Sequence, residues 1–256
     1  TYGWDLGPEN IGITNGSQSA FFILFNMLSG RLDAERGQGV TRLQQERGPG
    51  AWHEEEHREN HHKILLPFNP EYIGYADQGI GEDHFVSQRP LVESTGPHEF
   101  KYRVDFDALS LDSDIGAICV SRPTNPTGNV LTDTEVETLD HLALERGIPL
   151  MIDNAYGAPF PGILFTDIKP IWNPNIILGL SLSKIGLPST RTGILVARPE
   201  VIEAVSAVNA ITSLSNGSLG QALVGPLLDS GEMDELCRTV IQPWYAERSL
   251  RARESM

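Results

Sequence analysis

The chain has 256 residues, of which 40% are hydrophobic, a composition typical of a globular protein with one large domain or two small ones. Its formal net charge of -15 argues against a nucleic-acid partner and against an anionic membrane surface. No apolar run approaches the roughly 18 residues of a membrane span, and the opening stretch TYGWDLGPEN lacks the pattern of a signal peptide. The two cysteines, Cys119 and Cys237, fit a reduced, cytoplasmic protein, since neither has metal-site or redox spacing.

In chain order, segments with helical and strand-like patterns alternate. Residues 14–30 predict a polar turn followed by an apolar helix. Residues 33–62 are polar, dense in charge and contain glycine, which predicts a flexible insertion. Short apolar runs at 63–68 and 115–121 predict strands, and the second leads into the turn-forming sequence RPTNPTGNV.

A second helix is predicted over 132–147, where Thr132 and Glu135 form a capping-box pattern and Gly147 ends the helix. Further along the chain, apolar runs predict strands and one more helix: strands at 148–152, 176–180 and 193–197, and a helix at 199–211. This alternation of strands and helices favours a mostly parallel sheet covered by helices.

Polar side chains follow three of the predicted strands. Asn125 follows the strand at 115–121, Asp153 ends the next strand, and Lys184 follows the one after that. The separations of 28 and 31 residues are each about one βαβ unit of roughly 30 residues. We therefore expect the three side chains at the carboxyl edge of one sheet, where open α/β sheets bind ligands.

Together these residue types suit an aldehyde cofactor. The amine of Lys184 can attack a carbonyl and form a Schiff base. In pyridoxal phosphate (PLP), the ring nitrogen needs a carboxylate, which Asp153 can supply, and the phenolate oxygen needs donors such as Asn125 and Tyr156. The phosphate needs a helix N-terminus, hydroxyl groups and an arginine. The sequence offers these at Gly16, Ser17, Gln18, Ser181 and Arg191.

Three motifs resemble the fold-type I, class I and II aminotransferases: NPTG at 125–128, DNAY at 153–156, and SLSK with a following arginine at 181–191. The resemblance extends over the chain apart from residues 33–62. It implies an α/β fold, the three-layer α/β/α large domain of PLP-dependent transferases, with a seven-stranded, mainly parallel sheet. The large domain is expected over residues 1–238, and residues 239–256 are expected to begin the connection to a C-terminal small domain.

The resemblance also implies a role for each site residue. Lys184 is implied as the Schiff-base and proton-transfer residue, Asp153 as the partner of the pyridinium nitrogen, and Asn125 with Tyr156 as ligands of the phenolate oxygen. Tyr72, in the sequence PEYIGY, falls where the family stacks an aromatic ring on the cofactor. The implied phosphate cup consists of Gly16, Ser17, Gln18, Ser181 and Arg191, with Ser183 as a further member, although usually only one serine before the lysine binds phosphate.

The implied activity is transamination between valine or alanine and a 2-oxo acid, either pyruvate or 3-methyl-2-oxobutanoate, with alanine biosynthesis as the setting. The implied assembly is a cytoplasmic homodimer. The sequence departs from the family in two respects. Arg191 lies seven residues after Lys184, where many relatives have eight. The family's arginine for the substrate carboxylate, and an N-terminal tyrosine that reaches the partner subunit's phosphate, have no counterpart here, so we expect a chain truncated at both ends.

Three alternatives remain open at this point. A PLP-dependent lyase or racemase would use the same cofactor shell, and a half-reaction assay with amino and 2-oxo acids separates these from a transaminase. A non-catalytic PLP-binding regulatory module would need a DNA-binding segment, and no basic or helix-turn-helix pattern is present.

The third alternative is a zinc hydrolase. The sequence HEEEH at 53–57 formally matches the H-E-x-x-H zinc pattern. That pattern needs a buried helix with apolar intervening positions, whereas both positions here are glutamate. We therefore expect a solvated loop with no resident metal, in which His53, His57, His61 and His62 could at most bind a metal adventitiously.

Overall fold

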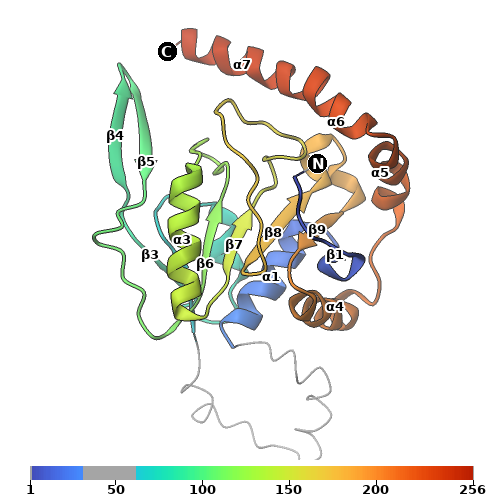
Figure 1. Cartoon of the computed structure of the whole chain (residues 1–256), viewed down its shortest axis with the longest axis horizontal. Helices are drawn as coiled ribbons and strands as arrows, with labels where there is room; N and C mark the ends of the chain where they lie inside the picture. Colours follow the sequence, from blue (N-terminus) through green and yellow to red (C-terminus); the bar gives the residue numbers. More distant parts are fainter. Residues whose placement is uncertain (1, 31–61, 256) are drawn as a thin grey trace, which may run out of the picture.

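The structure, a computed structural model, describes residues 2–30 and 62–255 (Figure 1). At its centre is a seven-stranded sheet in the order β1-β9-β8-β7-β6-β2-β3. Its strands are β1 Ile11–Thr14, β2 Lys63–Leu66, β3 Phe85–Ser87, β6 Ile115–Ser121, β7 Leu150–Asp153, β8 Ile176–Ser181 and β9 Gly193–Val196. Strand β9 is antiparallel to both β1 and β8, and the other neighbouring pairs are parallel. The predicted seven-stranded, mainly parallel sheet is therefore confirmed.

Helices cover both faces of this sheet, which gives the predicted three layers. Helix α3 (Asp133–Arg146) packs on one face, and helices α1 (Ser17–Leu28) and α4 (Pro199–Ser213) pack on the other (Figure 1). Successive residues of β6 alternate between the two faces, as the pleat of a strand requires. Ile118 and Val120 contact the core under α3, whereas Ala117 and Cys119 contact the core under α1.

The predicted boundaries of α3 are confirmed at both ends. The backbone N–H of Glu135 donates to the Thr132 hydroxyl at 3.2 Å, and the Glu135 carboxylate accepts from the Thr132 backbone N–H at 2.9 Å. Gly147 ends the helix with a φ of 66°, a conformation that glycine adopts without strain. The helices predicted over 14–30 and 199–211 are present as α1 and α4.

Other elements lie where the sequence patterns gave no assignment. A hairpin of β4 (Leu91–Gly96) and β5 (Glu99–Arg103) projects from the sheet, and helices α5 (Leu219–Ser230), α6 (Glu232–Leu236) and α7 (Gln242–Glu254) follow α4. A short π-helical stretch, Cys237–Ile241, joins α6 to α7. Helix α7 runs across the molecule toward the hairpin (Figure 1). There Arg253 pairs with Glu99 at 2.6 Å, an exposed ion pair that contributes little to stability.

The structure describes little of the segment for which a flexible insertion with four histidines was predicted. The predicted insertion at 33–62, with His53, His57 and His61, lies outside the described residues except for His62. Within residues 2–30 and 62–255, no helix combines the length and apolar character needed to cross a bilayer. In the same ranges no three His, Cys, Asp or Glu side chains group together as a metal site would require.

Candidate active site

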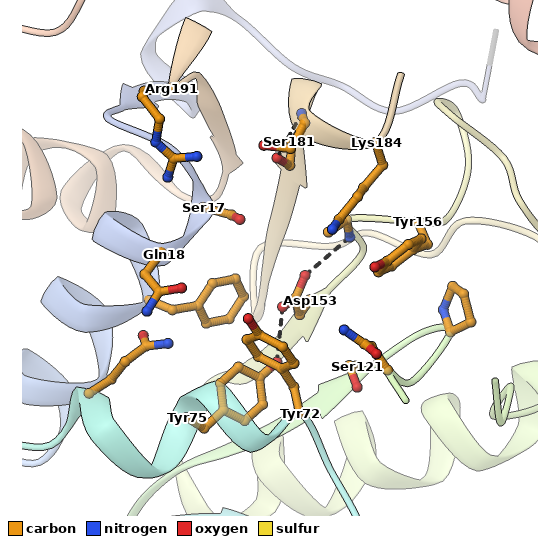
Figure 2. Close-up of a pocket in the computed structure, with 16 residues that line it drawn as sticks. Ser17, Gln18, Tyr72, Tyr75, Ser121, Asp153, Tyr156, Ser181, Lys184 and Arg191 are labelled. Atoms are coloured by element: carbon orange, nitrogen blue, oxygen red, sulfur yellow. Dashed lines mark hydrogen bonds between the residues drawn. The ribbon is translucent and has the colours of Figure 1, made fainter. Parts of the chain in front are cut away.

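A cavity of about 170 Å³ lies at the carboxyl edge of the sheet (Figure 2). Of the eleven site residues predicted from the sequence, all but Gly16 line it: Ser17, Gln18, Tyr72, Asn125, Asp153, Tyr156, Ser181, Ser183, Lys184 and Arg191. Gly16 precedes the first residue of α1, directly beside the cavity. The structure thus brings together residues that are up to 175 positions apart in the sequence.

The strand directions explain why these residues meet. Strands β6, β7 and β8 are parallel, so their carboxyl ends deliver Asn125, Asp153 and Lys184 to the same edge. Strand β9 is antiparallel to β8, so its amino end lies at that edge, and Arg191 comes two residues before β9. Lys184 itself lies in the 3₁₀ turn Leu182–Ile185, directly after β8.

Lys184 extends into the cavity from this turn (Figure 2). Its Nζ lies 4.7 Å from the centroid of the Tyr156 ring, a distance at which the ring face attracts a cation. The Ser181 hydroxyl accepts a hydrogen bond from the Ser183 backbone N–H at 3.1 Å, which caps the turn. Gly186 ends the turn with a φ of 103°. The lysine amine is therefore presented by a short, well-defined turn rather than by a long loop.

Asp153 forms the floor of the cavity at the end of β7. Its Oδ1 accepts from the Ala155 backbone N–H and its Oδ2 accepts from the Tyr75 hydroxyl, each at 3.1 Å (Figure 2). The enclosing protein disfavours the charged carboxylate and raises the pKa of Asp153, whereas the two hydrogen bonds and the charge of Lys184 act in the opposite direction. The carboxylate would therefore gain from a cationic N–H partner inside the cavity.

Tyr75 was not predicted as a site residue. It is buried and packs against Phe21, Phe25 and Tyr72, with ring centroids 5.2–5.8 Å apart. Burial is the main reason that its pKa is raised well above the usual value. The only signal in the sequence was a second tyrosine three positions after Tyr72 in PEYIGY, and an aromatic at that spacing reads equally well as core packing.

The opposite end of the cavity is a cradle for an anion. The first turn of α1 presents backbone N–H groups there, and the Arg191 side chain extends toward Ser17 (Figure 2). A Cβ at Gly16 would collide with the Arg191 guanidinium, and a Cβ at Gly193 would collide with the backbone of Gly16 and Ser17. The two glycines therefore allow the guanidinium and the helix N-terminus to approach each other, an arrangement that suits a phosphate.

The chemistry of these groups, and their order along the cavity, match the functional groups of PLP. The amine of Lys184 lies beside the cavity floor formed by Asp153, and the anion cradle lies at the far end. An aldehyde, a ring nitrogen and a phosphate each find a side chain or backbone group of suitable chemistry.

A family model, aminotransferase class I and II, matches residues 92–251. The chain belongs to this family. Aminotransferases of this family depend on PLP, which agrees with the fit of the cavity. The seven-stranded fold and the membership of the aminotransferase family, both expected from the motifs, are confirmed by the same match and by the structural relatives.

The relatives include enzymes acting on valine and pyruvate. Valine–pyruvate aminotransferase of Escherichia coli K12 is 49% identical over 246 residues, which cover 96% of this chain and 53% of that enzyme. The crystal structure of valine–pyruvate aminotransferase from Salmonella typhimurium is 46% identical, with a TM-score of 0.82 over 98% of this chain and 56% of that one. The motifs of the chain resemble those of this enzyme, and the two comparisons agree with that resemblance.

A more distant match shows the fold alone. Aspartate aminotransferase from Thermus thermophilus is 18% identical, with a TM-score of 0.65 over 98% of this chain and 56% of that one. The chain spans about half the length of the curated relatives it matches.

Proposed function

We propose that this chain carries the cofactor site of a PLP-dependent aminotransferase that moves an amino group between an aliphatic amino acid and a 2-oxo acid. The proposed pairs are valine with 3-methyl-2-oxobutanoate and alanine with pyruvate. The observation that carries the proposal is the meeting of the Lys184 amine, the Asp153 carboxylate and the Arg191 cradle in one cavity. The names of the relatives from Escherichia coli and Salmonella typhimurium support this choice of substrates.

The cofactor, when bound, supplies an aldehyde that accepts an amino group and a ring that withdraws electrons from the substrate's α-carbon. Lys184 is proposed to hold the cofactor covalently, to release it to the incoming amino acid, and then to carry the α-proton as a general acid and base. The position of its Nζ, 4.7 Å from the centroid of the Tyr156 ring and in the lining of the cavity, supports this role.

Asp153 is proposed to hold the proton on the ring nitrogen. Its carboxylate is held by hydrogen bonds from the Ala155 backbone and from Tyr75, so it would meet that nitrogen without reorganising. Asn125 and Tyr156 are proposed as donors to the phenolate oxygen, and Tyr72 as the ring that stacks on the cofactor. Edge-to-face contact with Tyr75, at 5.4 Å and 86°, supports a fixed Tyr72 ring.

The phosphate is proposed to lie in the cradle between α1 and Arg191. Its ligands are the backbone and side chains at the start of α1, the Ser181 hydroxyl and the Arg191 guanidinium, namely Gly16, Ser17, Gln18, Ser181 and Arg191. Ser183 is proposed as a weaker contributor, because its backbone N–H already donates to the Ser181 hydroxyl.

The remaining proposals concern the whole protein. Residues 1–238 are proposed as the large domain, with residues 239–256 as the start of the connection to a small domain. We also propose a homodimer in the cytoplasm that forms alanine. The proposal of a reducing compartment rests on the sequence, in which Cys119 and Cys237 have neither metal-site nor redox spacing.

A half-reaction experiment tests the activity. The PLP-loaded protein is mixed with valine or alanine, and both the visible absorbance of the cofactor and the 2-oxo acid released are followed. We expect conversion of the cofactor to its aminated form with stoichiometric 2-oxo acid, and reversal on addition of pyruvate. Racemised amino acid without 2-oxo acid, or loss of the side chain, would contradict the proposal and favour a racemase or a lyase.

A further inference from the structure

Glu71 is an enclosed carboxyl group that the proposed chemistry does not use. It lies between β2 and the 3₁₀ segment Ile73–Gln78, and 6% of its surface is exposed. Its Oε1 accepts from the Ser121 backbone N–H at 3.1 Å, and its Oε2 accepts from the Tyr72 backbone N–H at 3.2 Å. The Ser121 hydroxyl also contacts Oε2. One side chain therefore ties the segment carrying Tyr72 to the end of β6.

This tie lies directly behind the wall of the cavity. Tyr72, Ser121 and Asp153 line the cavity, whereas Glu71 does not. Ser121 and Asp153 are paired in the register of β6 and β7, so the carboxyl group of Glu71 reaches a position one strand from Asp153. A shift of Glu71 would therefore move Tyr72, the proposed stacking ring. It would also move strand β6, which lies beside Asp153, the proposed partner of the ring nitrogen.

The charges around Glu71 favour its neutral form. Asp153 on β7 faces it with a negative charge, while Tyr75 on the 3₁₀ segment and Cys119 on β6 contribute no positive charge. The positive charge of Lys184 lowers the pKa of Asp153. Within residues 2–30 and 62–255, no cationic side chain forms an ion pair with Glu71. The negative charge of Asp153 therefore disfavours a second negative charge on Glu71.

Resting on the proposed cofactor roles of Tyr72 and Asp153, we infer that Glu71 is a positioning residue that stays neutral behind the cavity. It holds Tyr72 and Ser121 in place and leaves the negative charge of the site on Asp153. In the neutral acid, the carboxyl proton is shared with the Ser121 hydroxyl, which can both donate and accept. In agreement, burial is the main cause that raises the pKa of Glu71 to about 8. The hydrogen bonds from Ser121 and from the Tyr72 backbone lower this pKa by less, and the charge of Asp153 adds to the rise.

The neutral state has a signature that needs no cofactor. A glutamate whose pKa is raised in the folded state stabilises the fold below its unfolded pKa, and this contribution is lost as pH rises through the folded pKa. The variant E71Q is uncharged at every pH and escapes this loss. The difference in Tm between E71Q and wild type should therefore move in favour of E71Q by several degrees between pH 5 and pH 8. An ionised, hydrogen-bonded Glu71 would not titrate in this range and would leave the difference unchanged between pH 5 and pH 8, which would overturn the inference.

The positioning role is tested by PLP affinity, measured by fluorescence titration. E71Q keeps the shape of the side chain but loses one of the two hydrogen bonds from backbone N–H groups, because an amide nitrogen cannot accept. It is expected to bind PLP more tightly than E71A and closer to wild type. E71A removes the tie and is expected to bind at least about tenfold more weakly, with an altered circular dichroism band of the bound cofactor. Glu137→Gln, on the exposed face of α3, is the matched control and should change neither quantity.

The outcomes separate this inference from the proposed function. Wild-type protein that does not bind PLP would contradict the proposed function itself. Wild-type protein that binds PLP, together with E71A that binds it equally well, would contradict only the role of Glu71. If E71A does not fold, the pH dependence of E71Q against wild type still decides, because a neutral Glu71 shifts the Tm difference by several degrees whereas an ionised Glu71 leaves it unchanged.

Discussion

The Arg191 guanidinium occupies the space that a Cβ on Gly16 would need. Gly16 has a φ of 88° and directly precedes α1, while Arg191 has a φ of 47° and directly follows the 3₁₀ turn Pro188–Thr190. Both backbone conformations are uncommon, and both lie at the same end of the cavity. Uncommon conformations persist where the surrounding structure fixes them, and they are concentrated at functional sites.

Replacing Gly16 by alanine should disturb this end of the cavity. The new methyl group must displace the Arg191 guanidinium, and the alanine must adopt the positive φ of this position. We therefore expect a loss of about 1–3 kcal/mol in the free energy of unfolding. PLP affinity should fall as well. Chemical denaturation and a PLP titration measure the two effects. Gly217→Ala is the control, since a Cβ there meets nothing within 4 Å; equal behaviour of the two variants would show that the contact is unimportant.

Replacing Arg191 by alanine should weaken PLP binding selectively. Charge-assisted, bidentate hydrogen bonds from arginine to phosphate are among the stronger polar contacts, so we expect a loss of about tenfold or more in affinity. Pyridoxal, which has no phosphate, should bind the variant and wild type alike. Titrations with both compounds provide the comparison. A similar loss for pyridoxal would place Arg191 at some other part of the cofactor.

Tyr75→Phe removes one hydrogen bond to Asp153 and leaves the ring in place. That hydrogen bond lowers the pKa of Asp153, so its loss should raise this pKa further. A carboxyl group with a raised folded pKa loses its stabilising contribution as pH increases. The destabilisation, about 1–3 kcal/mol, should therefore be larger at pH 7 than at pH 4. Thermal unfolding across this range measures it, with Tyr102→Phe in the hairpin as control. An effect independent of pH would indicate a packing role only.

Asp153→Asn should retain PLP but lose most amino-group transfer. The amide has nearly the same shape, yet it carries no charge to hold a proton on the ring nitrogen. We expect at least a tenfold loss in the half-reaction rate with valine, which corresponds to about 1.4 kcal/mol. Stopped-flow absorbance gives the rate, and the exposed Asp107→Asn is the control. A rate within about threefold of wild type would mean that Asp153 has another role.

Much of the fold and of the candidate site could be predicted because the information is local. Asn125, Asp153 and Lys184 each follow an apolar run, and parallel strands bring such positions to one edge. The start and end of α3 follow from Thr132, Glu135 and Gly147, which act within a single turn of helix. Arg191 could be predicted because it belongs to the same short motif as Lys184, seven residues further along the chain.

The site residues that could not be predicted are those whose role depends on contacts between segments far apart in the sequence. Tyr75 bonds to a residue 78 positions away, and Glu71 bonds to one 50 positions away. Nothing within either local sequence indicates these partners. The hairpin of β4 and β5 escaped prediction for a different reason: Leu91, Val92 and Phe100 are all exposed, so neither strand has the alternating burial that patterns reveal.

The central claim is that Lys184 is the residue that holds the cofactor covalently. The most direct measurement is borohydride reduction of the PLP-loaded protein followed by peptide mass spectrometry, with Lys184→Ala and Lys169→Ala treated in parallel. We predict one pyridoxyl group, on the peptide containing Lys184, in wild type and in Lys169→Ala, and none in Lys184→Ala. A pyridoxyl group fixed on another lysine of wild type, or fixed as efficiently in Lys184→Ala, would contradict the account.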